Sequence, residues 1–411
     1  MLRSLLKFAL AYFAAAILRK YRPRIVAITG STGKTTAKDA VFAVLSDPEH
    51  PGAVGRTQGN LNTEFGVTAN IIDPNFLGSK DEDKARLSLK DIVYLKWHAF
   101  KLLLTRGMYP KILVLELAAD RPGDIAYFMR FITPEVGVLT NIGDVHLEFF
   151  RDKASLIEEK GKLIAAVHPA GLAILNRDDE LANLVAQRTV AEKAFVGLAD
   201  GADWQARGLG ISASGLHFSA VHGSDSWPIE MPAFGQQFAY SALIALAVAD
   251  YFRLPLAIAA ERLKNFRPPA GRFERIELKN LTLIDDTYNA NPTSTLAALS
   301  SFSRLAGGRR RVAILGDMRE LGSAYEKGHR EVGEAAAKLT DLLLTVGEGG
   351  ELIGEAAVGA GLPPGLAIQL PEGGGDAVLG YLRDNDVVLV KGSRAVHMDK
   401  IVDLLKQKFG G

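Results

Sequence analysis

The chain has 411 residues, of which 48% are hydrophobic and 23% charged, and it contains no cysteine. This composition excludes a disordered or collagen-like chain, and the length predicts about two to three domains. The lack of cysteine excludes disulfide scaffolds, thiolate zinc sites and iron–sulfur clusters, and it is consistent with a reducing cytoplasm. The 48 Lys and Arg nearly balance the 47 Asp and Glu, so no overall positive field indicates a nucleic-acid partner.

Two segments of the N-terminal region have an amphipathic or apolar character. Residues 1–20 contain an uncharged apolar run from Phe8 to Leu18, which is too short to span a bilayer. We predict a helix here that docks on the protein or lies on a membrane surface; a signal anchor and a cleaved signal peptide are the alternatives. Residues 87–104 form an amphipathic pattern with interspersed lysines. We predict a helix that covers the sheet, and an interfacial helix that works with residues 1–20 is the alternative.

Strand and helix patterns alternate along the first large part of the chain. Buried strands are predicted over 24–29, 111–117, 135–140 and 171–176, and helices over 34–45, 124–131 and 153–167. Such alternation indicates a mostly parallel sheet covered by helices. Residues 204–230 instead alternate apolar and polar side chains between glycine turns, which predicts a small antiparallel appendage. Helices over 236–252 and 256–265 complete this unit.

A second, smaller α/β unit follows a predicted hinge at Pro268–Gly271. Its strands are predicted over 282–286, 311–315, 341–346, 367–370 and 387–391, with helices between them. That rhythm is typical of a doubly wound, Rossmann-like domain. The glycine-rich stretches 347–350 and 372–375 are expected to be surface loops. The predicted division is an N-terminal helix (1–20), a central ATP-binding domain (21–270) and a C-terminal domain (271–411).

The strongest chemical signal follows the first predicted strand. It is the run Gly30-Ser31-Thr32-Gly33-Lys34-Thr35-Thr36, which leads into a helix. A strand, a glycine-containing loop and a helix aim backbone N–H groups and the positive helix end at phosphates. Lys34 supplies a charge for the β- and γ-phosphates, and Thr35 a hydroxyl for Mg²⁺. Ile28 stands where the general phosphate-loop pattern has glycine, and an ordinary glycine turn is the alternative.

Three further residues are candidates for the same site. Glu116 ends an apolar strand, at the place where open α/β sheets hold ligand groups. A magnesium ligand is one interpretation, and a buried salt bridge is the other. His146 follows the next strand in a loop, and Lys160 lies within a predicted helix. Taken singly, each of these two fits a structural or solvated side chain at least as well.

The order of these motifs resembles the Mur ligase family of ATP-dependent amide-bond-forming enzymes. The matching strings in the first unit are Gly30–Thr36, Leu115–Leu117, Asp144–Glu148, Glu159–Gly161 and Asn176–Asp179. Those in the second are Gly271–Glu274, Asp285–Pro292, Gly316–Gly322 and Val390–Arg394. The last three are similar to the subgroup that adds D-alanyl-D-alanine to UDP-N-acetylmuramoyl-tripeptide. The resemblance covers residues 22 to 405.

The resemblance implies a cytoplasmic enzyme that uses ATP and two Mg²⁺ ions, and a position at the inner face of the membrane is the alternative location. A substrate carboxylate would attack the γ-phosphate, and an amine would then attack the acyl phosphate. Lys34 would neutralise the transferring phosphoryl group, and Thr35 with Glu116 would hold one Mg²⁺. His146 and a carbamylated Lys160 would hold the second. Because the family's nucleotide site forms between domains, closure would be needed to complete it.

The resemblance also assigns residues further along the chain. The nucleotide would contact the phosphate loop and Gln237, Arg272, Asp286, Tyr288 and Asn289. In a structure without ligands, Arg272 and Asp286 are expected to lie beyond hydrogen-bond reach of the phosphate loop. The other substrates, a UDP-muramoyl peptide and D-alanyl-D-alanine, would contact Asn291, Asp317, Lys391, Ser393 and Arg394.

The sequence departs from the family pattern in three places. Gln237, Phe238 and Ser241 stand where the adenine-side motif has His-Asn and a further Asn, and Arg177 replaces a smaller residue. Only residues 1–20 precede the ATP-binding domain, so the family's N-terminal UDP-sugar-binding domain is expected to be absent. Two alternatives to the D-alanyl-D-alanine reaction therefore stay open: a related ligase for a different acid and amine, and a non-catalytic ATP-binding scaffold.

Overall fold

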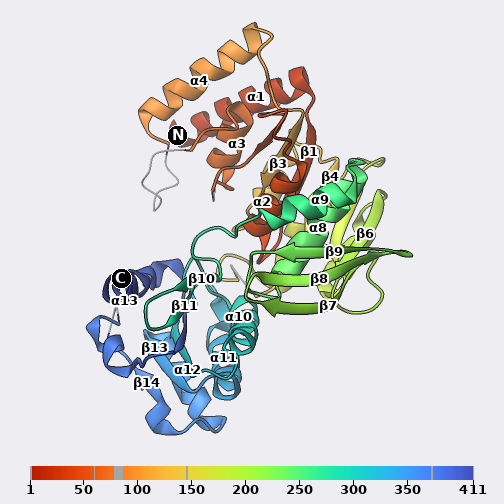
Figure 1. The fold of residues 1–411 in the computed structure, drawn as a ribbon. Helices are drawn as coiled ribbons and strands as arrows, with labels where there is room; N and C mark the ends of the chain where they lie inside the picture. The colour runs from red at the N-terminus through yellow and green to blue at the C-terminus, as the bar shows by residue number, and fades with distance from the viewer. Residues whose placement is uncertain (1, 60, 78–86, 145–146, 372–373, 411) are drawn as a thin grey trace.

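The computed structural model describes residues 2–59, 61–77, 87–144, 147–371 and 374–410 (Figure 1). Within these residues two sheets organise the chain, one of nine strands and one of six. The elements of the first unit are α1 (Leu2–Tyr21), β1 (Arg24–Thr29), α2 (Lys34–Leu45), β2 (Val54–Arg56), α3 (Glu64–Ile72), α4 (Leu89–Leu104), β3 (Ile112–Glu116), α5 (Asp124–Phe128), β4 (Val136–Leu139), α6 (Lys153–Ala165), β5 (Leu172–Asn176), α7 (Glu180–Val185), β6 (Glu192–Gly197), β7 (Trp204–Ser212), β8 (Gly215–His222), β9 (Asp225–Met231), α8 (Phe238–Tyr251) and α9 (Leu256–Lys264).

The first sheet has the order β2-β3-β1-β4-β5-β6-β7-β8-β9. The strands from β2 to β7 pair in parallel, and β7, β8 and β9 form antiparallel pairs. The mostly parallel sheet and its antiparallel appendage are therefore confirmed, and the appendage continues the main sheet. The register places Ile28 of β1 beside Glu116 of β3. The carboxyl ends of these two strands thus lie together, which is where a parallel sheet builds its ligand site.

Alternate residues of β1 serve the two cores on opposite faces of the sheet. Val26 and Ile28 pack with α2, α8 and α9, whereas Ile25 and Ala27 pack with α1, α3, α5 and α6. Successive side chains of a strand point to opposite faces, so a continuous apolar run is what a strand buried on both sides requires. The strand is fully buried after Arg24.

The N-terminal helix α1 is docked on this scaffold. Ala14 and Leu18 pack against the sheet, and Leu10 and Ile17 pack against α3 and α4. The docked helix is the first of the interpretations that the sequence favoured. In the described part of the chain, no helix is long and apolar enough to cross a membrane.

The position of α4 differs from the prediction. The helix exists, but it packs on α1 and α3 and so covers helices instead of the sheet (Figure 1). Its buried residues Leu95, Ala99 and Leu102 meet Leu10 and Ile17 of α1. The physical reason is that α1 and α3 already occupy that face of the sheet. A sequence pattern that shows one buried face does not say what the face is buried against.

The second unit contains β10 (Glu274–Glu277), β11 (Thr282–Asp286), α10 (Pro292–Leu305), β12 (Arg311–Gly316), α11 (Tyr325–Leu339), β13 (Leu342–Val346), α12 (Glu348–Gly359), β14 (Ala367–Gln369), β15 (Val387–Lys391) and α13 (Asp399–Phe409). Its sheet has the order β10-β11-β15-β12-β13-β14, parallel except for β10. The five predicted strands are present.

The stretch 347–350, which was expected to be a surface loop, is the start of α12. Gly349 and Gly350 are buried there, and a Cβ on Gly349 would overlap Asp317 and His329. The glycines therefore permit close packing of the helix start, and the surface-loop interpretation of this stretch is wrong. Residues 372–373 of the other expected loop lie outside the described residues.

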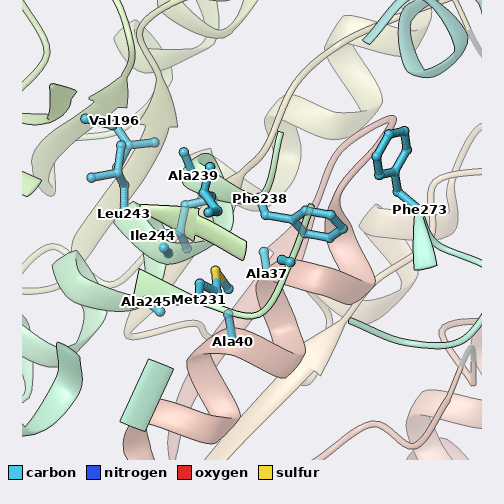
Figure 2. Packing of buried hydrophobic residues seen from close by; sticks show 14 of the residues in the cluster. Ala37, Ala40, Val196, Met231, Phe238, Ala239, Leu243, Ile244, Ala245 and Phe273 are labelled. Carbon is cyan, nitrogen blue, oxygen red and sulfur yellow. The ribbon is translucent and has the colours of Figure 1, made fainter. Parts of the chain in front are cut away.

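The two units share part of one core. Phe238 begins α8 of the first unit, and Phe273 immediately precedes β10 of the second. Both belong to the cluster that also contains Ala37 and Ala40 of α2 (Figure 2). The phosphate loop leads directly into α2, so the site and the contact between the units lie in the same region.

Candidate functional site

The phosphate loop connects β1 to α2. Gly30 and Gly33 have positive φ angles of 147° and 77°, which glycine adopts without strain. A Cβ on Gly30 would overlap the hydroxyl of Thr140, so the loop also needs glycine for close approach to β4. Gly33 stands at the start of α2 and its backbone carbonyl accepts the first helical hydrogen bond, from Ala37 N–H at 2.8 Å. The positive end of α2 thus opens into the loop.

The segment after β4 holds the loop in place. Asn141 Oδ1 accepts a hydrogen bond from Thr32 N–H at 2.8 Å, and Thr140 Oγ1 donates to Thr32 O at 2.6 Å. Ser31 Oγ accepts from Gly143 N–H at 2.9 Å and donates to Gly143 O at 3.2 Å. The segment that follows β4 therefore fixes the loop before any phosphate binds, which is the preorganisation that phosphate chemistry requires.

Lys34 folds over this loop. Its Nζ donates to Gly30 O at 2.8 Å and to Ser31 O at 3.2 Å. Burial lowers the pKa of Lys34 from its ordinary value, and the charge of Arg272 acts in the same direction, although Glu116 and Asp120 oppose it. Carbonyl groups are weak partners for an ammonium group. Phosphate oxygens are stronger ones, because hydrogen bonds between ionised partners are about twice as strong.

Glu116 lies at the end of β3 with its carboxylate buried. Oε1 accepts hydrogen bonds from Asn62 Nδ2 at 2.9 Å and from Thr35 Oγ1 at 3.1 Å. Oε2 is buried and accepts no hydrogen bond. Burial raises the pKa of Glu116, but the charges of Lys38, Lys34 and Arg272 outweigh burial and bring the pKa below its ordinary value. The carboxylate is therefore ionised and keeps one oxygen available beside the Thr35 hydroxyl.

Two residues of this cluster were missed by the sequence analysis. Lys38 is fully buried; its Nζ lies 3.5 Å from Glu116 Oε2 and donates to Gly59 O at 2.7 Å. Asn62 supplies the hydrogen bond to Oε1 described above. The signal for Lys38 was available: it stands four residues after Lys34, hence on the same face of α2 one turn later. Asn62 comes from a loop with no local sign of its partner, 54 residues away.

Lys160 is buried, which excludes a solvated surface lysine. It lies on α6, and its Nζ donates to Gly30 O at 3.0 Å. Burial and the charge of Lys34 lower the pKa of Lys160 to about 7. The neighbouring Glu159 points elsewhere and accepts hydrogen bonds from Ile125 N–H and Lys162 Nζ. The side chains of Lys34 and Lys160 thus meet at the same carbonyl, although they are distant in sequence.

His146 lies outside the described residues, so its predicted place beside Lys160 stays a prediction. Among the described residues, no three His, Asp or Glu side chains gather in a group that could hold a metal. A metal at Glu116 would take its remaining ligands from hydroxyl groups, phosphate oxygens and water, which is the usual coordination of Mg²⁺ beside a nucleotide.

Arg272, the first candidate from the second unit, already reaches the phosphate loop. Its Nη2 donates to Thr35 Oγ1 at 2.9 Å, and its guanidinium stacks 3.9 Å from the ring centre of Tyr288. The expectation that Arg272 lies beyond hydrogen-bond reach is wrong. The reason is the compact hinge: Gly271 has a φ of 67°, and its carbonyl accepts from Tyr288 N–H at 3.0 Å, which fixes Arg272 against the neighbouring ring.

Asp286 is paired within its own domain. Its Oδ2 accepts from Lys391 Nζ at 2.7 Å and its Oδ1 from Phe273 N–H at 3.0 Å. Burial raises the pKa of Asp286 despite the opposing charge of Lys391. Lys391 also donates to the carbonyl of Asn289 at 2.9 Å. The structure thus brings Asp286, Lys391 and Asn289 together, and it describes no contact of Asp286 with the phosphate loop.

The remaining candidates of the second unit surround the carboxyl ends of β11, β12 and β15. Asn291 caps α10 through a hydrogen bond from Ser294 N–H at 2.9 Å, and Ser393 Oγ accepts from Arg319 N–H at 2.8 Å. Asp317 is buried and its Oδ2 lies 2.9 Å from Arg319 Nε. The guanidinium of Arg394 lies 5.6 Å from the ring centre of Tyr288.

Gln237 lies at the contact between the two units. Its Oε1 accepts a hydrogen bond from Ser301 Oγ of α10 at 3.1 Å, and the adjacent Gln236 accepts one from Arg304 of the same helix. The amide of Gln237 is thus engaged by the C-terminal unit, and its predicted contact with the nucleotide stays a prediction.

Comparison with known families identifies the two units. A family model described as the Mur ligase middle domain matches residues 28–249, and one described as the Mur ligase glutamate ligase domain matches residues 271–394. The UDP-N-acetylmuramoyl-tripeptide–D-alanyl-D-alanine ligase of Escherichia coli K12 is 28% identical over an alignment 410 residues long, which covers 98% of this chain and 81% of that protein. The enzyme of the same name from Mycobacterium bovis is 30% identical, over 93% of this chain and 72% of its own length.

Solved structures have the same fold. A MurF ligase from Thermotoga maritima in complex with ADP superposes with a TM-score of 0.80 at 24% identity, covering 98% of this chain and 84% of that one. Folylpolyglutamate synthase from Mycobacterium tuberculosis, also with ADP, gives a TM-score of 0.64 at 17% identity. The alignments span α1 as well as both sheets.

Proposed function

The chain belongs to the Mur ligase family, and from this premise we propose that it joins D-alanyl-D-alanine to UDP-N-acetylmuramoyl-tripeptide in peptidoglycan precursor synthesis, with hydrolysis of ATP to ADP and phosphate. The observation that carries the proposal is the match, over 98% of the chain, to relatives named for this reaction. Because the phosphate loop and its neighbours are a site for ATP chemistry in general, the identity of the acid and the amine rests on the relatives.

The proposed reaction has two steps. An oxygen of the substrate carboxylate attacks the γ-phosphorus of ATP, the bond to the β-phosphate oxygen breaks, and ADP leaves. The amine nitrogen of D-alanyl-D-alanine then attacks the carbon of the acyl phosphate, loses a proton, and expels inorganic phosphate. The protein has little covalent work in such a sequence, so positioning and charge neutralisation account for the rate.

The residues around the phosphate loop suit this work. Lys34 at the loop carbonyls and Arg272 at the Thr35 hydroxyl supply positive charge to the phosphate loop, where negative charge would accumulate during phosphoryl transfer. Oε2 of Glu116, which accepts no hydrogen bond and lies 3.5 Å from Lys38 Nζ, and the hydroxyl of Thr35 fit a magnesium ion and would hold it. When bound, the metal supplies charge neutralisation and orientation of the phosphates.

We propose a carbamate on Lys160. A lysine with a pKa of about 7 is largely neutral at physiological pH, and a neutral amine nitrogen can bond to the carbon of CO₂ with loss of a proton. The product is an anionic oxygen ligand, which suits a hard metal, whereas the ammonium form would repel it. His146 is the proposed partner of this group. The burial of Lys160 beside the loop supports the proposal.

We propose a cytoplasmic location, where ATP and nucleotide-sugar substrates are present. Membrane contact by α1 is part of this proposal. Phe8 and Tyr12 of this helix, each 65% exposed, support it because they line an apolar groove with Tyr127 and Phe131.

The deciding experiment measures phosphate release from ATP with UDP-N-acetylmuramoyl-tripeptide, with and without D-alanyl-D-alanine, and identifies the product by mass. Release that needs both substrates, with a product heavier by the dipeptide, is expected. Release with another acid or amine only would point to a related ligase. Failure of every acid and amine tested, with ATP still bound, would leave the non-catalytic scaffold.

The variant Lys34→Ala supplies the control for this assay. It should lower turnover at least about 100-fold, because the lost interaction is a charge positioned for the transition state. The thermal unfolding temperature should stay close to that of the wild type, since the hydrogen bonds that the structure describes for Lys34 go to carbonyl groups of the loop. Lys193→Ala, an exposed lysine of β6, should change neither quantity. Turnover by Lys34→Ala within a few fold of wild type would contradict the assignment of the phosphate loop.

A further inference from the structure

The outer face of α4 carries a stripe of large apolar side chains that are more than half exposed, although the ring of Phe100 also contacts Phe13 of α1 with the ring centres 5.2 Å apart. Leu89, Val93, Trp97, Phe100 and Leu104 are between 53% and 82% exposed. Isolated exposed apolar residues are common on protein surfaces, but a contiguous set on one helix face marks an interaction site.

The geometry of the helix shows that these side chains share one direction. Their spacing of four, four, three and four residues keeps them within a sector of about 80° at about 100° per residue. The buried residues Leu95, Ala99 and Leu102 occupy the opposite side, which faces α1 and α3. The helix is thus apolar on two opposite faces, and only one of them is covered by the described protein.

Lysines border the exposed stripe on both sides. On the helix wheel Lys96 lies at one edge, and Lys90 and Lys101 lie at the other. The single acidic residue of α4 is Asp91, whose carboxylate accepts a hydrogen bond from Ser88 N–H in the capping box at the helix start. The turn after α4 adds the exposed residues Arg106 and Met108. The whole face therefore combines apolar and cationic groups with almost no negative charge.

We propose that this face of α4 docks on the surface of an anionic lipid bilayer. A stripe that contains Trp and Phe, bordered by lysines that can reach outward to head groups, is the pattern of a helix lying in the membrane interface. Anionic head groups complement the lysines. A second copy of this chain is a poorer occupant, because pairing two such faces would bring lysine edges together without acidic partners.

The position of α4 fits this role. It lies at the end of the molecule away from the C-terminal domain, so docking leaves the phosphate loop accessible (Figure 1). The proposal therefore does not rest on the proposed catalytic function, and it differs from a contact made by α1 alone. The buried face of α4 fixes the helix on a folded scaffold. Membrane binding by the exposed stripe therefore does not carry the entropic cost of ordering a free helix.

The test is flotation of the full-length protein with lipid vesicles, without ATP or substrates. The vesicles contain phosphatidylcholine alone or with about one third phosphatidylglycerol. The wild type should bind the anionic vesicles, and the triple variant Trp97→Ser, Phe100→Ser and Leu104→Ser should lower the partition coefficient at least about tenfold. All three side chains are exposed, so the unfolding temperature should not fall. The matched control Leu184→Ser with Val190→Ser removes two exposed apolar side chains elsewhere and should bind like the wild type.

A second variant tests the charges. Lys90→Gln, Lys96→Gln and Lys101→Gln together should weaken binding to anionic vesicles about fivefold per lysine and should reduce its dependence on salt.

Equal binding of wild type and apolar triple variant would overturn the proposal. So would a wild type that is dimeric in light scattering and becomes monomeric in the apolar variant, with no affinity for either vesicle, because the stripe would then join two copies. Ligase activity in solution should be unchanged in all variants, which separates this outcome from that of the proposed function.

Discussion

Three lysines gather around the phosphate loop, and two of them, Lys38 and Lys160, are fully buried. Lys34 and Lys160 share the carbonyl of Gly30, and Lys38 faces Glu116. Grouping several ammonium ions in a poorly solvated site raises the energy of the protein without ligand. A triphosphate would relieve that cost, and neutralisation of Lys160 by proton loss relieves part of it. The pKa values of Lys34 and Lys160 are lowered for the same reasons, namely burial and the neighbouring positive charges.

Lys160 gives the sharpest residue-level prediction. Lys160→Ala should be nearly inactive and partly rescued by acetate or formate, which can supply the missing carboxylate oxygens. Lys160→Arg, which cannot form the carbamate, should also be inactive. Because the pKa lies near 7 and below its ordinary value, the reactive neutral amine is depleted as pH falls through 7. At fixed dissolved CO₂, the carbamate signal in ¹³C NMR should therefore rise with pH across that value. Normal activity of the Arg variant would end the carbamate hypothesis.

Lys38 is predicted to keep Glu116 ionised and in place. Burial alone would raise the pKa of Glu116, and the charge of Lys38 is the largest effect in the opposite direction. Lys38→Met keeps much of the buried volume but removes the charge, so the pKa of Glu116 should rise. The acid limb of the pH profile of kcat/KM should then move upward by about one to three pH units. Lys38→Arg, which keeps the charge, is the control, and an acid limb at the wild-type pH in the Met variant would contradict the role.

The contrast between these residues shows what a sequence can reveal about a site. Lys34 and Glu116 were predictable, because a loop motif and the end of an apolar strand have fixed positions in this type of sheet. Lys160 was identifiable only through the family resemblance, since a lysine on a helix gives no local sign of burial. The hydrogen bond from Asn62 to Glu116 and that from Arg272 to Thr35 depend on tertiary packing, which local sequence patterns do not reveal.

At the level of elements, α1 and α4 form a helical layer outside the main sheet. The apolar residues of α1 are divided between two cores, one against β1 and one against α4, so this helix is a structural part of the unit. Its removal should therefore cost stability. The strands were easier to predict than this layer. Arg24–Thr29 matches its predicted bounds because a short apolar run between polar residues is unambiguous, whereas α4 has two apolar faces.

Substitutions within α1 test its structural role. Ile17→Ala should lower the free energy of unfolding by about 2–5 kcal/mol, because Ile17 is fully buried between α1, α3 and α4 and leaves a cavity. Phe8→Ala removes a larger but mostly exposed side chain of the same helix and should change it by less than about 1 kcal/mol. Urea unfolding followed by circular dichroism measures both. Equal effects of the two substitutions would mean that α1 is not docked as described.

At the level of the whole molecule, the two sheets meet around the phosphate loop. Arg272 reaches Thr35, Ser301 reaches Gln237, and Thr293 of α10 lies against Gly143 after β4. The first contact comes from the segment before β10 and the other two from α10, so all three would change if the units moved. These three contacts are polar and lie beside the shared apolar core, and polar contacts between domains permit relative motion more readily than a large apolar interface. A site that closes in this way excludes water during phosphoryl transfer and opens for product release.

A reversible crosslink tests whether the units must separate during turnover. An ideal Cβ at Gly143 would lie 3.6 Å from Cβ of Thr293, within the range of disulfides, and the natural chain has no cysteine to interfere. We expect Gly143→Cys with Thr293→Cys to form an intramolecular disulfide under mild oxidation. Titration should then show the loss of two free thiols, and the protein should still migrate as a monomer on a non-reducing gel. The oxidised protein should turn over at least about tenfold more slowly than the same protein after reduction, because nucleotide exchange needs the open arrangement.

Each single-cysteine variant, treated identically, should be insensitive to oxidation and so controls for damage near Ser31. Failure of the disulfide to form would show that this contact is rarely populated in solution, and equal turnover of the oxidised and reduced forms would show that opening at Gly143 and Thr293 is not part of the cycle.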